Sequence, residues 1–181
     1  NGIKFWQGQH DGYSKLSDPV IHKRTVILLG GNNWLIVDHV KGQQPHDFNL
    51  QWLLDNQFLQ SEDKHDQLYL EHQSKTLKAQ FGKLGEQPDP ESTCGWVSHY
   101  YGHKEPALSV QLQAHHHEML FWSFFGEDSF SMVSKPDQLN LTNDDITDKK
   151  KGSDLNEIEF EVLRKINKYW DKALVLTNDI D

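Results

Sequence analysis

The stretch that decides the fold runs from residue 10 to residue 52 and reads HDGYSKLSDPVIHKRTVILLGGNNWLIVDHVKGQQPHDFNLQW. Apolar and β-branched residues fill 25–29 and 34–37, and the Gly-Gly-Asn-Asn sequence between them is typical of a hairpin turn. Residues 40–44 indicate a second turn, after which apolar and polar side chains alternate over 46–52 as they do in a strand. We therefore predict that this stretch forms a three-stranded antiparallel sheet.

Four polar side chains fall on one face of that predicted sheet. If the turn at 30–32 closes the first hairpin, Arg24 lies opposite Asp38, with His22 two residues further along the same face. A second turn that pairs Asp38 with His46 would complete the cluster. Two imidazoles and a carboxylate can bind zinc when water or a further residue completes the site, so His22, Asp38 and His46 are predicted metal ligands. The alternative is a structural ion pair between Arg24 and Asp38 without a metal, and a one-residue slip in register would break the cluster.

Short strand-like runs continue along the chain as far as residue 135, and no helix is predicted before that point. Strands at this spacing without intervening helices predict an all-β fold, an antiparallel β-sandwich of the supersandwich type. The domain is expected to cover residues 1–136. A polar linker is then expected over 137–154. Over 155–181 we expect a charged segment with a frayed end, whose apolar spacing fits a strand or a helix and whose charge density favours the helix.

Composition excludes several classes of protein. The chain has 181 residues and a formal net charge of −9, which argues against a general nucleic-acid binder. No apolar run approaches the roughly 18 residues that a membrane-spanning helix needs. Cys94 is the single cysteine, so neither an internal disulfide nor a multi-cysteine metal site can form. Aromatic residues make up 11% of the chain, which suits both a sandwich core and a sugar-binding surface.

Several motifs occur together in an order that resembles a known family. They are HDGY followed by Leu16, PVIHKR at 19–24, WLIVD at 34–38, Gly42 with His46, GWVS at 95–98 and YGHKEPA at 101–107. This ordered set resembles the C-terminal β-sandwich region of the heparinase II/III-like family of polysaccharide lyases. The resemblance covers roughly residues 5–135.

That resemblance implies a function and a larger protein. Members of the family pair an N-terminal α/α toroid with the sandwich and cleave uronic-acid-containing acidic polysaccharides by β-elimination at a site between the two parts. A metal bound by histidine and aspartate of the sandwich often supports that site. The chain contains nothing like the toroid, so we expect a fragment that is inactive without the toroid of the same parent chain. The resemblance also implies a periplasmic or extracellular location.

The chemistry of β-elimination indicates which residues to test. A base must take the C5 proton of the uronate, an acid must protonate O4, and a cation must neutralise the carboxylate. His10 and Tyr13 are the candidate catalytic residues, and Arg24 is a candidate for substrate binding. Asp-Gly is also a turn signal, so a purely structural role for the HDGY loop stays open.

A second patch, formed by Tyr100, Tyr101 and His103, is a candidate platform for sugar rings, although core packing of one tyrosine is the alternative. Two other functions stay open: a non-catalytic carbohydrate-binding or accessory module, and an interaction module whose tail docks on a partner. The net charge of −9 also favours a weakly charged uronate polymer over a sulfated glycosaminoglycan, unless the toroid supplies the basic residues.

Overall fold

The computed structural model describes residues 4–30, 32–55, 59–64, 67–72, 75–126, 130–134 and 139–143. Within these ranges all regular structure is strand, which confirms the predicted all-β fold. The strands are β1 (Lys4–His10), β2 (Ile21–Gly30), β3 (Asn33–Leu53), β4 (Leu59–Lys64), β5 (Gln67–His72), β6 (Lys75–Lys83), β7 (Glu91–Val97), β8 (Glu105–Gly126), β9 (Phe130–Ser134) and β10 (Leu139–Asn143).

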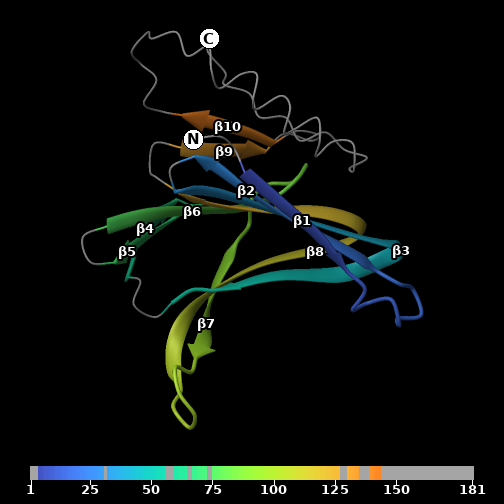
Figure 1. Ribbon diagram of the computed structural model, residues 1–181, viewed down its shortest axis with the longest axis horizontal. Coiled ribbons are helices and arrows are strands. Elements are labelled where there is room, and N and C mark those ends of the chain that lie inside the picture. Colours follow the sequence, from blue (N-terminus) through green and yellow to red (C-terminus); the bar gives the residue numbers. More distant parts are fainter. Residues whose placement is uncertain are drawn as a thin grey trace.

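Two antiparallel sheets make up the described part of the chain (Figure 1). The larger sheet has eight strands in the order β1-β2-β3-β8-β6-β5-β4, and β7 pairs with β8 beside this path. β9 and β10 form a separate two-stranded sheet on one side of it. Met132 of β9 and Leu139 of β10 are buried against the larger sheet, so that one face of the larger sheet has its own core.

Two long strands, β3 and β8, fold the larger sheet over on itself. Their pairing breaks between Lys41 and His46, and the second half of β3 then continues along β8 in a new register. Trp52 of that second half donates a hydrogen bond from Nε1 to Ser123 Oγ (2.7 Å) and meets the ring of Phe125 edge-on at 5.1 Å. Both partners lie in the part of β8 that pairs with the first half of β3, so the two halves of the sheet face each other as the layers of a sandwich (Figure 1).

The space between these layers holds the second hydrophobic core. Leu50 and Leu112 project into it from the folded-over part, while Leu70, Phe81 and Phe121 project from the opposite layer, and all five are buried. The predicted apolar face of residues 46–52 is confirmed, since Phe48, Leu50 and Trp52 pack in this core. Burial of each large side chain contributes roughly 1.5–3 kcal/mol, and this is the main force that closes the fold.

The first predicted hairpin is confirmed and the second is wrong. Arg24 pairs with Asp38 and His22 with Val40, as expected, with one irregularity near the hairpin tip between Leu28 and Gly30. Residues 40–44, however, do not reverse the chain. They lie within β3, because both halves of this strand find backbone partners on β8, 56 or more residues away.

Part of the predicted linker is a strand. Its residues 139–143 form β10, in which Leu139 is fully buried. A single well-packed leucine and pairing with β9 therefore outweigh the polar composition of this segment. The remainder of the predicted linker and the predicted helix within 155–181 lie outside the described residues.

Candidate functional site

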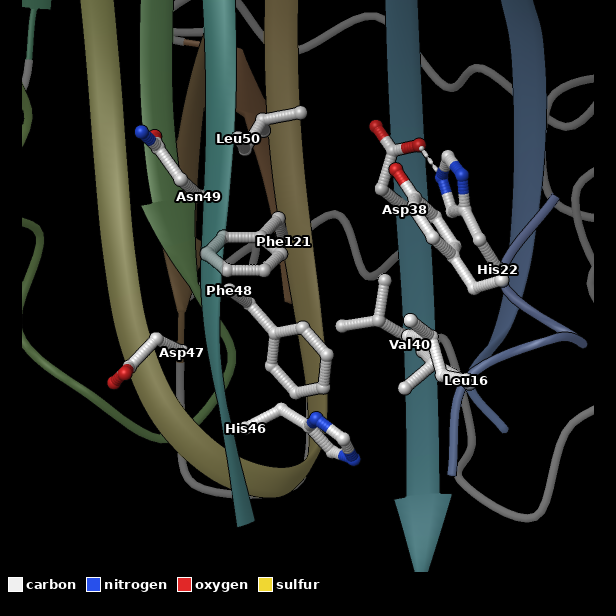
Figure 2. Close-up of a pocket in the computed structure, with 12 residues that line it drawn as sticks. Leu16, His22, Asp38, Val40, His46, Asp47, Phe48, Asn49, Leu50 and Phe121 are labelled. Carbon is white, nitrogen blue, oxygen red and sulfur yellow. Dashed lines mark hydrogen bonds and ion pairs between the residues drawn. The ribbon is translucent and has the colours of Figure 1, made fainter. Parts of the chain in front are cut away.

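A cavity of about 230 Å³ opens at one side of the sandwich, where the two layers separate. The first layer contributes His22 and Asp38, and the folded-over second half of β3 contributes His46 and Phe48. Tyr13, from the loop between β1 and β2, also lines it. Figure 2 shows His22 and Asp38 facing each other across neighbouring strands. Val40 and Phe48 lie between this pair and His46. The fold thus brings candidate residues of three segments around one opening.

A directed chain of hydrogen bonds runs from the surface into the wall of this cavity. The Gly12 amide donates to His10 Nδ1 (3.0 Å), so the neutral His10 ring carries its proton on Nε2. That Nε2 group lies 2.9 Å from His22 Nδ1 and donates a hydrogen bond to it. His22 Nε2 then donates to Asp38 Oδ1 at 2.6 Å. One backbone donor therefore fixes the tautomers of both histidines.

Asp38 is the buried end of this chain, since only 1% of the residue is exposed. Burial raises the pKa of Asp38, but the hydrogen bonds from His22 and Arg24, together with the charge of Arg24, outweigh burial and leave the pKa below its ordinary value. Arg24 donates from Nε to Oδ1 (2.7 Å) and from Nη2 to Oδ2 (3.0 Å). The carboxylate is therefore ionised, and it accepts hydrogen bonds from both His22 and Arg24.

Arg24 reaches solvent from this buried pair. Its side chain is 37% exposed, and its guanidinium lies 5.4 Å from the centroid of the Trp52 ring. The indole and the carboxylate together hold the guanidinium in one place. The exposed part of a fixed guanidinium is suited to binding a carboxylate of a ligand.

Asp18 ties the loop between β1 and β2 to the bend of β3. Its carboxylate accepts hydrogen bonds from the backbone amides of Gln43 (3.1 Å) and Gln44 (2.8 Å) and from His46 Nε2 (2.7 Å). The hydrogen bond from the Gln44 amide lowers the pKa of Asp18, and the hydrogen bond from His46 lowers it to a smaller extent. A side chain at Gly42 would meet His46 Cδ2 at 2.7 Å, so glycine leaves the space for this pair. The tether holds Tyr13 and Leu16 of the loop at the cavity.

The predicted zinc ligands do not converge. His22 and Asp38 are hydrogen-bonded to each other, but His46 is bonded to Asp18 instead of facing Asp38. Arg24 already occupies both oxygens of Asp38, and its charge opposes a cation there. No group of three ligand side chains suited to a metal occurs among the residues with assigned positions. The described residues therefore do not fit a zinc ion at this place, and zinc binding stays an untested prediction.

The second predicted patch lies elsewhere, at the tip of the hairpin between β7 and β8. Tyr100 and Tyr101 are 63% and fully exposed, so the core-packing alternative is excluded for both. The rings of Tyr100 and His103 stack with their centroids 4.6 Å apart. None of these three side chains lines the cavity described above. In Figure 1 this hairpin projects away from the rest of the sheet.

Local sequence patterns did not indicate two residues of this candidate site. Asp18 gives only a weak signal, the Asp-Pro dipeptide that often begins a turn. Phe121, which forms part of the cavity floor, comes from β8 and is brought there by pairing across more than 80 residues. Neither position follows from local patterns, because both depend on the bend of β3.

The fold and the site together define a class: an all-β sandwich with a histidine-rich cavity at the edge of its layers. The model of the family described as Heparinase II/III-like, C-terminal matches residues 1–151, and the chain belongs to this family. No curated protein sequence matches it. In the part of the chain that the structure describes, no helix is long or apolar enough to cross a membrane.

Solved structures share the fold at low sequence identity. A mutant of the heparan sulfate lyase HepC from Pedobacter heparinus is similar over 80% of this chain and 25% of its own, with a TM-score of 0.64 and 16% identity. A heparinase III gene product is similar over 74% of this chain and 22% of its own, with a TM-score of 0.62 and 15% identity. The chain therefore spans about a quarter of the length of these proteins, and at such identities the likeness shows the fold alone.

Proposed function

We propose that this chain is the C-terminal β-sandwich wall of the active site of a polysaccharide lyase, which cleaves a uronic-acid-containing polysaccharide by β-elimination. The observation that carries the proposal is the hydrogen-bonded chain from His10 through His22 to the buried Asp38 beside a cavity. Membership of a heparinase-like family supports it. The other wall belongs to an N-terminal α/α toroid of the same parent chain, without which the fragment is inactive.

The chain of histidines suits transfer of the C5 proton. When His10 takes up a proton at Nδ1, the bond from the Gly12 amide is released and the Nε2 proton moves towards His22. The resulting positive charge is stabilised by the Asp38 carboxylate. The electron pair left at C5 forms the C4–C5 double bond as the C4–O4 bond breaks.

Tyr13 and Arg24 fill the other two roles. The Tyr13 ring lies 5.1 Å from that of His10 and lines the cavity, which supports the Tyr13 hydroxyl as the acid that protonates the departing O4. The partly exposed Arg24 neutralises the uronate carboxylate, which makes the C5 proton more acidic. His10 and Tyr13 are therefore the proposed catalytic residues, and Arg24 binds the substrate.

The test is an ultraviolet assay for unsaturated uronates on the full-length parent protein, with heparin, heparan sulfate, chondroitin sulfate and alginate as substrates. We expect product from at least one of them, and a loss of roughly 10²–10⁴-fold in kcat for His10→Ala. Absence of product from all four substrates would contradict the lyase. A periplasmic or extracellular location, expected for a protein that acts on such polymers, is tested by fractionating the producing cells.

A second candidate function, a non-catalytic carbohydrate-binding module, rests on the hairpin tip. The exposed Tyr101 and the stacked pair of Tyr100 and His103 present rings to solvent away from the cavity. Glycan-affinity electrophoresis of Tyr100→Ala and Tyr101→Ala variants tests this function. Unchanged retention on every polysaccharide would exclude it and leave the lyase untouched.

A further inference from the structure

The ribbon formed by β1 and β2 has a charge opposite to that of the whole chain. The protein has 27 acidic and 18 basic side chains, yet these two strands contain Lys4, Lys23 and Arg24 and no aspartate or glutamate. β1 is the edge of the eight-stranded sheet, drawn in dark blue in Figure 1. An acidic ligand therefore meets a more favourable local charge at this ribbon than the net charge of −9 suggests.

One face of this ribbon leads directly away from the cavity. Alternation along β1 places Lys4, Trp6, Gly8 and His10 on one face. The register sets Gly8 beside Arg24 and His10 beside His22, the residue that lines the cavity. Trp6 and His10 are four steps apart along an extended strand, which is about 13 Å. We call this line of side chains the β1 strip.

The indole of Trp6 presents a flat, exposed face in the middle of the β1 strip. It is 60% exposed, and its six-membered ring lies over Gly8, where a Cβ atom would stand 2.5 Å from Cη2 and 2.6 Å from Cζ2. Glycine at position 8 therefore lets the indole rest on the strand with a face open to solvent. Flat aromatic faces of this kind cover the apolar faces of pyranose rings, while nearby cations bind acidic substituents.

We propose that the β1 strip is an extended subsite for the acidic polysaccharide, in which the Trp6 indole stacks on a sugar ring beyond the cleavage point. Lys4 and Arg24 flank this ring and bind the acidic groups of the sugars on either side of it. The proposal rests on the proposed function for the choice of polymer. It also gives a chain with a net charge of −9 a local path for a polyanion, since Lys4 and Arg24 lie along this face and neither β1 nor β2 contains an acidic residue.

Four variants of the full-length parent protein test the β1 strip. Trp6→Ala removes the platform, and we expect KM for the polymer to rise about tenfold with kcat little changed. Trp6→Phe keeps a ring and should recover most of the affinity. Gly8→Ala displaces the indole, because the three atoms nearest to the added methyl group all belong to the Trp6 ring, and it should also raise KM. Phe5→Ala is the matched control: this ring is 43% exposed on the opposite face of the same strand, and its loss should leave KM unchanged.

Hydroxyl-radical footprinting gives a readout that does not depend on turnover. Trp6 should be oxidised in the free full-length protein and protected by heparan sulfate or alginate oligosaccharides. Protection without any oligosaccharide would mean that the rest of the parent chain covers Trp6, and it would overturn the proposal. An unchanged KM in Trp6→Ala while cleavage continues would also overturn it and leave the lyase standing. Trp6-dependent binding without cleavage would support the β1 strip and contradict the lyase, and absence of both binding and cleavage would contradict both.

Discussion

At the scale of single residues, the site depends on the groups that keep the buried carboxylate of Asp38 ionised. Burial disfavours the carboxylate, and Arg24 and His22 offset that penalty by hydrogen bonds to both oxygens. A buried carboxylate without such partners would take up a proton near neutral pH. The ion pair that was the alternative to a zinc site is therefore present, and it also orients His22 towards His10.

Arg24→Gln should shift the acid limb of the stability curve towards neutral pH. In the wild-type protein the folded pKa of Asp38 lies below the unfolded value of about 3.9, so its contribution to stability is complete above that value and is lost as the pH falls through the folded pKa. Without Arg24 the folded pKa rises and the loss begins at higher pH. Urea unfolding between pH 3 and pH 8 measures this shift. Lys23→Gln removes the same charge on the opposite face and should leave the acid limb in place.

His22→Gln should separate proton transfer from substrate binding. Glutamine can accept a hydrogen bond from His10 and donate one to Asp38, but it cannot carry the proton between them. We expect kcat of the full-length protein to fall roughly 10²-fold or more, with KM nearly unchanged. A rise in KM of similar size with kcat unchanged would show that His22 only shapes the cavity.

At the scale of elements, the loop between β1 and β2 is held by one carboxylate. Asp18 satisfies two backbone amides at the bend of β3, where the ladder with β8 is interrupted. These amides would otherwise need solvent, because the strand offers them no partner at the break in register. The position of Tyr13 at the cavity therefore depends on a side chain that lies outside every strand.

Asp18→Asn should loosen this loop without unfolding the sandwich. An asparagine oxygen can accept one of the amide hydrogen bonds but lacks the charge that the His46 imidazole faces. Hydrogen exchange read by mass spectrometry should therefore accelerate at Gln43 and Gln44. Asp11→Asn, in the same loop, serves as the control, because Asp11 contributes its backbone carbonyl rather than its carboxylate to the hydrogen bond with Ser14. Equal exchange in both variants would refute the tether.

At the scale of the whole molecule, the sandwich closes when the larger sheet folds over at the break in β3. Trp52 joins the two layers through its ring and through the hydrogen bond to Ser123, whose side chain is fully buried. Removing one partner of a buried hydrogen bond leaves the other unsatisfied, which costs about 1–3 kcal/mol. Closure of the layers therefore depends on this contact as well as on the apolar core.

A double-mutant cycle of Trp52→Phe and Ser123→Ala should reveal the coupling between the layers. We expect each single variant to lower the free energy of unfolding and the double variant to lose less than the sum, with a coupling of about 1 kcal/mol. Chemical denaturation followed by circular dichroism gives the four values. Strict additivity would mean that the hydrogen bond does not contribute to closing the sheet.

Local patterns were sufficient for part of the fold and part of the site. The all-β class, the hairpin that pairs Arg24 with Asp38, and the face shared by Phe48, Leu50 and Trp52 could all be predicted. Each depends on strand alternation and on a short turn, whose geometry is set by neighbouring residues. The same local rules led to a wrong second hairpin at 40–44, since its Lys-Gly-Gln-Gln sequence is equally compatible with a bend.

The tertiary structure alone decided where His46 and the cavity lie. Both halves of β3 gain backbone hydrogen bonds from β8, a strand distant in the sequence, and this pairing keeps the chain extended through Gly42. His46 is thereby carried into the second layer and pairs with Asp18 instead of Asp38. The sequence by itself determined which residues could form a polar cluster across one hairpin. Long-range strand pairing determined which of them meet, because a local pattern carries no information about a partner strand far along the chain.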